Sequence, residues 1–172
     1  EPDQTEANFR CRGLEPADAK LLAPEILVSA SLTKILVGEN GLGDEGTTIL
    51  CDALRESTVS KVEELNLNYN GIGPDGAKAI AALCAVRASL TKISVGRNGL
   101  GDEGTTILCD ALRESTVSKV EELDLSLNDI SPDGARAIAA LCAVRGSLTS
   151  VRWPPAHEPK PCLHSLSPRM QH

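Results

Sequence analysis

This chain contains one 58-residue unit twice, with few changes. Residues 32–89 and 90–147 align over all 58 positions without a gap and differ at nine of them. Each unit divides again, so that four shorter repeats follow one another in steps of 30, 28 and 30 residues. They begin at Leu32, Val62, Leu90 and Val120. A period of this length predicts a solenoid, in which each repeat is one supersecondary unit that packs on its neighbours.

Each repeat opens with the same apolar spacing, L-x-x-L-x-L-x-x-N-x-L with conservative exchanges, as in LTKILVGENGL. Ile35 and Val37 alternate as the residues of a short strand do. An asparagine follows each strand, where its amide can hydrogen-bond backbone groups that a turning chain leaves unpaired. The sequence therefore predicts a structural asparagine column, made of Asn40, Asn70, Asn98 and Asn128.

The second half of each repeat has helical spacing. The segments TTILCDALRES and AKAIAALCAVR carry apolar residues three and four positions apart, and alanine and leucine favour a helix there. Acidic residues stand where these helices start and suit the positive end of the helix dipole. Parallel strands stack about 4.8 Å apart, whereas packed helices need roughly 8 to 10 Å. We therefore expect a curved stack, with strands on the concave side and helices on the convex side.

Alternating repeats of 28 and 30 residues with this opening and a full helix resemble the ribonuclease-inhibitor-like branch of leucine-rich repeat proteins. The resemblance covers residues 4–153. It implies an α/β fold, a leucine-rich repeat solenoid shaped as a horseshoe arc. That branch includes ribonuclease inhibitor, the sensing regions of NOD-like receptors, tropomodulin-type actin proteins and the Ran GTPase-activating protein. The resemblance therefore implies a fold without selecting one function.

The two ends of the chain depart from the repeat pattern. Residues 1–31 follow the same register as a degenerate N-terminal repeat, and residues 148–153 repeat only a strand opening, in which Trp153 falls in the inward column. Residues 154–172 are rich in proline, and we expect this tail to be disordered. Between the ends, we predict repeats at 32–61, 62–89, 90–119 and 120–147.

The stretch GLGDEG at residues 41–46 has the G-x-G-x-x-G spacing of a dinucleotide-binding loop. However, it returns unchanged at residues 99–104, whereas a cofactor site is normally built once per domain. Asp44 and Glu45 would also face the phosphates, with no basic residue in the loop to offset them. We therefore expect no nucleotide at these turns and interpret the glycines as repeat geometry. We expect close helix packing at Gly46, Gly76, Gly104 and Gly134.

Composition indicates the kind of partner and compartment. The net charge of −7 disfavours nucleic acid as a partner and favours a basic protein surface. We see no signal peptide or membrane span and expect no membrane contact. Cys51 and Cys109 share one helical register and Cys84 and Cys142 another, too far apart for a disulfide between equivalents. We interpret these cysteines as reduced and mostly buried, which favours a cytoplasmic location.

Catalytic groups are scarce in the repeats. All three histidines lie in the tail, where His157, Cys162 and His164 do not have the spacing of a zinc site that we recognise. The repeats thus have no histidine to serve as a general base. Glu63 and Glu64 are adjacent on a strand and point to opposite faces, so they cannot share a substrate. We predict that this protein is not an enzyme and holds no metal or other cofactor.

Differences between the two 58-residue units indicate a binding surface. The helical stretch TTILCDALRESTVSK is identical in both units, whereas five of the nine exchanges fall on outward strand positions or strand exits. These pairs are Leu36/Ser94, Glu39/Arg97, Asn66/Asp124, Asn68/Ser126 and Tyr69/Leu127. We predict that they form a partner-binding surface, with Tyr69 and Arg97 as anchors, because aromatic and arginine side chains often dominate binding energy. Uneven drift between the units is the alternative explanation.

A second row on the same face alternates in charge, from Lys34 through Glu64 and Lys92 to Glu122. It is interpreted as a charge ladder that stabilises the sheet. Together these observations predict a non-catalytic module that binds a partner protein through its concave strand face. Two alternatives stay open. One is a regulator of an enzyme, either an inhibitor or a GTPase activator of the Ran-GAP type. The other is a structural segment of a larger NOD-like receptor-type protein.

Overall fold

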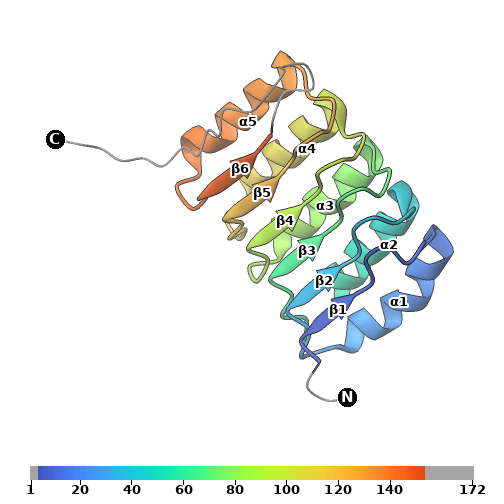
Figure 1. The fold of residues 1–172 in the computed structure, drawn as a ribbon. Helices are drawn as coiled ribbons and strands as arrows, with labels where there is room; N and C mark the ends of the chain where they lie inside the picture. The colour runs from blue at the N-terminus through green and yellow to red at the C-terminus, as the bar shows by residue number, and fades with distance from the viewer. Residues whose placement is uncertain (1–3, 154–172) are drawn as a thin grey trace.

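Short strands and helices alternate along residues 4–153, the part of the chain that this computed structural model describes (Figure 1). The strands are β1 (Glu6–Asn8), β2 (Lys34–Leu36), β3 (Glu64–Asn66), β4 (Lys92–Ser94), β5 (Glu122–Asp124) and β6 (Ser150–Arg152). The helices are α1 (Pro16–Val28), α2 (Gly43–Glu56), α3 (Pro74–Val86), α4 (Gly101–Glu114) and α5 (Pro132–Val144). Residues 154–172, for which we expect disorder, lie outside the described residues.

The strands form one parallel sheet in chain order, from β1 to β6. Their register follows the repeats, so Ile93 lies between Leu65 and Leu123. The middle residue of each strand points inward. Leu65, Ile93 and Leu123 are all buried. A second buried column, just after the strands, consists of Val37, Leu67, Val95 and Leu125. The core is therefore a stack of equivalent layers, each contributed by one repeat.

The helices cover one side of this sheet and leave the other side open, which gives the arc seen in Figure 1. Each helix packs on the helix of the next repeat, and no helix contacts one further away within the described chain. This arrangement confirms the predicted α/β solenoid, with strands on the concave side.

Glycine at the start of α3 and α5 allows the helices to come close. A Cβ atom on Gly76 would lie 2.5 Å from Cγ2 of Ile72 and 2.6 Å from Oδ1 of Asp44. On Gly134 it would lie 2.5 Å from Oδ1 of Asp102. Such distances are too short for a side chain, so these glycines are required by packing.

The asparagine side chains join consecutive repeats through backbone groups. Nδ2 of Asn98 donates to the carbonyl oxygens of Leu67 (3.1 Å), Val95 (2.9 Å) and Gly96 (3.2 Å). Its Oδ1 accepts from the backbone N–H groups of Asn70 (2.9 Å) and Ile72 (3.1 Å). One buried amide thus bonds five backbone groups in two consecutive repeats.

Candidate protein-binding surface

Three parallel rows of side chains make up the open face of the sheet. The first is the charge ladder, which consists of Lys34, Glu64, Lys92 and Glu122 in direct register on β2 to β5. Nζ of Lys34 lies 3.3 Å from Glu64, and Nζ of Lys92 lies 3.2 Å from Glu64 and 3.6 Å from Glu122. The charges of this row largely neutralise one another, as expected of a ladder that stabilises the sheet.

Glu64 is the central anion of the ladder, and its carboxylate has a lowered pKa. Burial by itself would raise that pKa, but hydrogen bonds from Lys92 and Lys34, together with their charges, outweigh burial. In turn, the hydrogen bond that Lys92 donates to Glu64 is the main cause of a raised pKa for Lys92. Both groups therefore stay ionised at neutral pH, so Glu64 acts as the counter-ion of the two lysines.

The second row, at the last position of each strand, contains four of the predicted binding residues. Leu36 and Asn66 are half-buried, whereas Ser94 is only 7% exposed. Ser94 differs from the expected contact residue because its short side chain lies between the longer Asn66 and Asp124 on either side. It therefore forms the floor of the surface.

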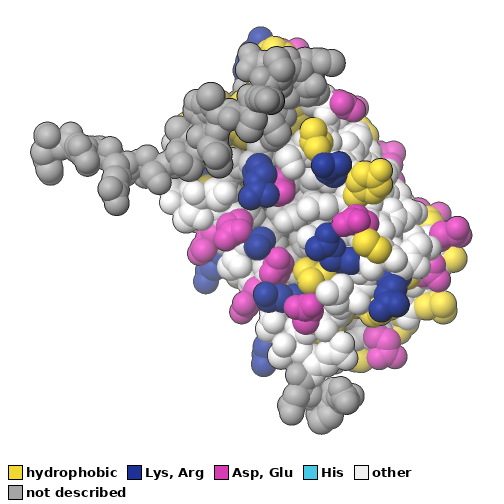
Figure 2. Space-filling view, in the orientation of Figure 1, with side chains coloured by type: hydrophobic (Ala, Val, Ile, Leu, Met, Phe, Trp, Pro, Cys, Tyr) yellow, Lys and Arg dark blue, Asp and Glu magenta, His cyan; other side chains and the backbone are white. Residues whose placement is uncertain are grey.

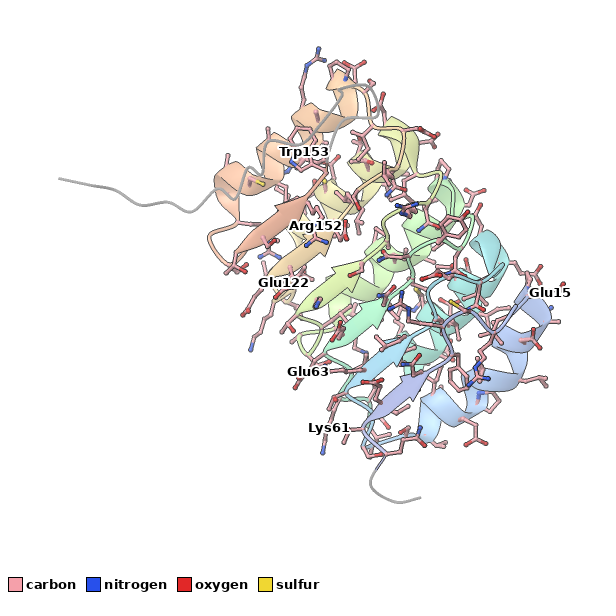
Figure 3. The ribbon with its side chains drawn as sticks, in the orientation of Figure 1. Glu15, Lys61, Glu63, Glu122, Arg152 and Trp153 are labelled. Atoms are coloured by element: carbon pink, nitrogen blue, oxygen red, sulfur yellow. The ribbon has the colours of Figure 1, made fainter. Side chains whose placement is uncertain are left out.

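Polar side chains of the second row already have partners within the protein. Oδ1 of Asn66 accepts from the backbone N–H of Asn68 at 3.1 Å. Oδ1 of Asp124 accepts from the backbone N–H of Ser126 at 3.0 Å, while its Oδ2 pairs with Arg152 at 3.2 Å. Figure 3 shows Arg152 on β6 beside β5, which carries Glu122. These bonds give Asn66 and Asp124 a structural role at the ends of their strands.

Arg152 did not figure in the sequence-based surface, although counting 28 residues from Asp124 would have placed it there. It helps to enclose a shallow hollow above the charge ladder, with Ser94 among the lining residues. The hollow has a volume of about 210 Å³, below the roughly 300–1,000 Å³ typical of small-molecule sites. Figure 2 shows basic and acidic side chains intermixed on this face. The geometry suits a surface contact better than an enclosed ligand.

The third row lies where the chain leaves each strand, and we call it the strand-exit row. It consists of Glu39, Tyr69, Arg97 and Leu127, all of them exposed. Every member has a positive φ, between 55° and 60°, which is uncommon for residues other than glycine. This conformation could not be predicted from the sequence, because neither asparagine nor glycine occupies the row.

Hydrogen bonds donated to the next repeat hold this backbone in place at Glu39, Tyr69 and Arg97. The N–H of Tyr69 donates to the carbonyl of Gly96 at 2.9 Å, and the N–H of Arg97 donates to that of Ser126 at 2.7 Å. Oδ1 of Asn68 also accepts from the N–H of Gly96 at 2.6 Å. Asn68 therefore supports the row from within, while the side chains of the row project into solvent from a fixed backbone.

Members of the strand-exit row differ in how their side chains are used. Glu39 accepts from Sγ of Cys11 at 3.1 Å and pairs with Arg10 at 2.7 Å, and these hydrogen bonds lower the pKa of its carboxyl group. Arg97 forms no ion pair with any residue between 4 and 153. Tyr69 and Leu127, the neighbours of Arg97 in the row, are 58% and 46% exposed. The row thus presents a cation between two apolar groups.

Backbone amides of the GLGDEG turn are engaged within the fold. The N–H of Leu42 donates to Oδ1 of Asn70 at 3.3 Å, and the N–H of Gly43 donates to the backbone carbonyl oxygen of Asn70 at 2.9 Å. At the next helix, Oδ1 of Asp44 accepts from Gly73 (2.6 Å) and Gly76 (2.9 Å). A phosphate at either helix start would have to displace these bonds. This capping of one helix by the preceding helix was not predicted from the sequence. The sequence indicated only that Asp44 suits the positive end of its own helix.

Other chemistry is sparse in the part of the chain that the structure describes. Among residues 4–153, no cluster of three or more potential ligands is arranged to hold a metal ion. None of the helices found there combines the length and apolarity needed to cross a membrane. His157, Cys162 and His164 lie outside the described residues. Burial raises the pKa of the Cys84 thiol to about 12, so this side chain is not a ready nucleophile.

Comparison with known proteins agrees with this geometry. A family described as "Leucine Rich repeat" matches residues 60–81, 88–106 and 118–139. This chain is a leucine-rich repeat protein. It is related to ribonuclease inhibitor, to RAN GTPase-activating protein and to the repeat regions of NACHT, LRR and PYD domains-containing proteins, as its resemblance to the ribonuclease-inhibitor-like branch predicted.

The similarity to individual relatives covers part of each. RAN GTPase-activating protein 2 of Arabidopsis thaliana is 39% identical over 98 residues, which is 57% of this chain and 18% of the relative. Ribonuclease inhibitor of Sus scrofa is 36% identical over 100 residues, 58% of this chain and 22% of the relative. NACHT, LRR and PYD domains-containing protein 5 of Mus musculus is 34% identical over 113 residues, 66% of this chain and 10% of the relative. This leucine-rich repeat chain therefore spans about a fifth or less of each of these relatives.

A solved structure has the same fold. The leiomodin-1 actin-binding site 2 superposes with a TM-score of 0.68 over 81% of this chain and 79% of that one. At 17% identity, this similarity shows the leucine-rich repeat fold alone.

Proposed function

We propose that this leucine-rich repeat chain is a non-catalytic module that binds a partner protein through the concave strand face. The supporting observation is the strand-exit row, in which Tyr69, Arg97 and Leu127 project from consecutive repeats. Inter-repeat hydrogen bonds hold the backbone of Tyr69 and Arg97. Exposed aromatic, arginine and leucine side chains on a rigid frame are the groups from which binding hot spots are built.

The distribution of differences between the two 58-residue units supports the same face. Tyr69 and Leu127 occupy equivalent positions, as do Glu39 and Arg97, so the strand-exit row differs between the halves at both of its paired positions. The helices that cover the convex side are nearly identical. In this proposal, each predicted repeat from 32–61 to 120–147 contributes one strand exit to the binding surface.

The experiment that tests this proposal is affinity capture from cell lysate with two matched double variants. The concave variant, Tyr69→Ala with Arg97→Glu, truncates one exposed side chain and reverses one charge. The convex variant, Val86→Ala with Arg136→Glu, makes the same two kinds of change on α3 and α5, where both residues are exposed. Circular dichroism establishes first that both variants fold.

We expect a protein that the wild type and the convex variant retain and that the concave variant loses. Retention by the concave variant together with loss by the convex variant would move the binding site to the helices and contradict the proposal. The absence of any specific capture by the wild type would favour a structural segment of a larger protein, as in the NACHT, LRR and PYD domains-containing relatives.

Regulation of an enzyme is the second candidate. It is supported by the relatives named ribonuclease inhibitor and RAN GTPase-activating protein. Such a regulator would bind through the same face but would also change a rate. Once a captured partner is identified, its turnover with and without the wild-type chain separates the two: a change in turnover supports regulation, and unchanged turnover with intact binding supports a scaffold.

A further inference from the structure

Cations on the open face of the sheet are paired, with one exception. In the described chain, five cations lie on the strands or within three residues after them. Arg10 pairs with Glu39, Lys34 and Lys92 pair with Glu64, and Arg152 pairs with Asp124. Arg97 has no such partner between residues 4 and 153 and is exposed. Its guanidinium is therefore the available cation of this surface.

The duplication shows how this cation became available. Arg97 occupies the position of Glu39 in the first unit, and both residues have the same left-handed backbone, with φ of 55° and 60°. Glu39 finds its counter-ion in Arg10 of the preceding strand exit. The residue equivalent to Arg10 before Arg97 is Asn68, which has no charge and whose Oδ1 already accepts from Gly96. The exchange thus reverses the charge and removes the partner.

The neighbours of Arg97 define what could bind beside it. Adjacent strands lie about 4.8 Å apart, so Tyr69 and Leu127 lie within side-chain reach on either side. A guanidinium binds a carboxylate through two parallel hydrogen bonds, and an aromatic and an aliphatic neighbour favour an apolar residue next to that carboxylate. Arg97 would repel a lysine-rich surface of a partner.

We propose that Arg97, between Tyr69 and Leu127, receives a carboxylate side chain from an acidic and partly apolar segment of the partner protein. This inference rests on the proposed function and specifies the partner at that site. It differs from the basic partner that the net charge of −7 favours, because that charge belongs to the whole chain, whereas Arg97 is a cation that forms no ion pair within residues 4–153.

The test uses the whole 172-residue chain and pools of synthetic hexapeptides in fluorescence polarisation. The pools differ at one central position, which is Glu, phosphoserine, Ala or Lys. The two residues that flank it are either Leu and Phe or two serines. We expect the pool with Glu between Leu and Phe to bind at least about tenfold more tightly than the pools with Ala or Lys at the centre. A factor of ten corresponds to about 1.4 kcal/mol.

Variants of Arg97 decide whether that preference comes from this residue. Arg97→Glu should abolish the preference for a central Glu, and Arg97→Lys should retain only part of it because the two-pronged geometry is lost. Glutamate is compatible with the backbone here, since Glu39 has the same conformation in the first unit. Arg136→Glu, which makes the same charge change on α5, should leave the preference intact.

Three results would overturn the inference: no peptide preference in the wild type, an equal effect of Arg136→Glu, or a clear preference for phosphoserine over Glu, which would assign the site to phosphate. Failure of the inference can be told from failure of the proposed function by the single variants. If Tyr69→Ala alone loses a captured partner and Arg97→Glu alone keeps it, the concave face still binds and only the carboxylate assignment fails.

Discussion

At the scale of single residues, the strand-exit row combines strain with exposure. A residue other than glycine in the left-handed region costs roughly 1–2 kcal/mol relative to the right-handed one. Tyr69, Arg97 and Leu127 all adopt it, and none of them is buried. Burial therefore does not compensate for the conformation, and at Tyr69 and Arg97 backbone hydrogen bonds to the next repeat maintain it. This is consistent with residues retained for what they present to solvent.

The positive φ of Leu127 predicts that glycine is more stabilising than alanine at this position, the reverse of the usual order within a helix. We expect Leu127→Gly to be more stable than Leu127→Ala by roughly 0.5–1 kcal/mol, because relief of the positive φ exceeds the added entropy of the unfolded chain. Urea denaturation of both variants measures the difference. The same comparison at Ala139, an exposed position within α5, should have the ordinary sign, with Ala139→Gly less stable by about 1 kcal/mol. If alanine were more stable than glycine at both positions, the strain at Leu127 would be contradicted.

At the scale of elements, the helices of the 30-residue repeats, α2 and α4, each cap the helix that follows them. Asp102, in the first turn of α4, accepts from the backbone N–H of Ser131 (2.8 Å) and of Gly134 (3.0 Å), where α5 begins. It also accepts from Oγ of Ser131 at 2.5 Å. A carboxylate therefore satisfies amides at the positive end of a helix to which it does not belong. The capping links neighbouring repeats on the convex side, as the asparagines do beside the strands.

Removal of the Asp102 carboxylate should lower stability in a pH-dependent way. The hydrogen bonds from Ser131, and then the one from Gly134, lower the pKa of Asp102 below its ordinary value of 3.8. The stabilisation is thus complete above about pH 3.8 and is lost as the pH falls through the lower pKa of the folded state. We expect Asp102→Ala to lower the melting temperature at pH 7 and to differ less from wild type at pH 2 to 3.

The control for Asp102 is Glu103→Ala, which removes the neighbouring acid of the same helical turn. Glu103 caps no amide in the described structure and is exposed. It should change the melting temperature less at pH 7. Equal effects of the two substitutions would show that general charge at the helix start, and not the cap, stabilises α5.

The charge ladder predicts a salt-dependent contribution to the sheet. Glu64→Gln removes the anion that pairs with both Lys34 and Lys92 and leaves their charges facing a neutral side chain. We expect it to lower the free energy of unfolding by about 1 kcal/mol at low ionic strength and by less in 1 M salt. Glu63→Gln, the adjacent exposed acid without an ion pair in the described chain, should have little effect at either ionic strength. A loss for Glu64→Gln that salt leaves unchanged would argue against an electrostatic origin.

At the scale of the whole molecule, the fold is a linear stack in which each layer depends on its two neighbours. Ile35 and Ile93 stand at equivalent positions of the two units, and both are buried. Ile93 lies between Leu65 and Leu123, whereas Ile35 lies between Ala7 and Leu65. The same residue thus has a large neighbour on both sides in one unit and on one side only in the other.

This difference predicts unequal costs for identical substitutions. We expect Ile93→Ala to lower the free energy of unfolding by roughly 2–5 kcal/mol, the usual range for a buried isoleucine. Ile35→Ala should cost less, because fewer contacts are lost beside Ala7. Equilibrium denaturation of both variants measures the two costs. An equal or larger cost for Ile35→Ala would show that the position in the stack does not govern stability.

The fold could be predicted because its signals lie within single repeats. Ile35 and Val37 alternate within one strand, and both are buried as that pattern indicates. The binding surface could be predicted only in outline. Tyr69 and Arg97 stay predictions as partner contacts, and their positions are exposed. Ser94 lies on the same face but is shielded by longer neighbours, which a pattern of alternation does not reveal.

The sequence alone therefore determined the period, the inward columns and the order of strand and helix, because these depend on the spacing of residues near one another in the chain. The tertiary structure decided which charges are paired. The contacts of Glu39 with Arg10 and of Asp102 with Gly134 join residues about one repeat apart, which become neighbours only when repeats stack. Stacking also holds Arg97 in its left-handed conformation. It leaves Arg97 without a counter-ion in the described chain, since Asn68 occupies beside Arg97 the position that Arg10 occupies beside Glu39.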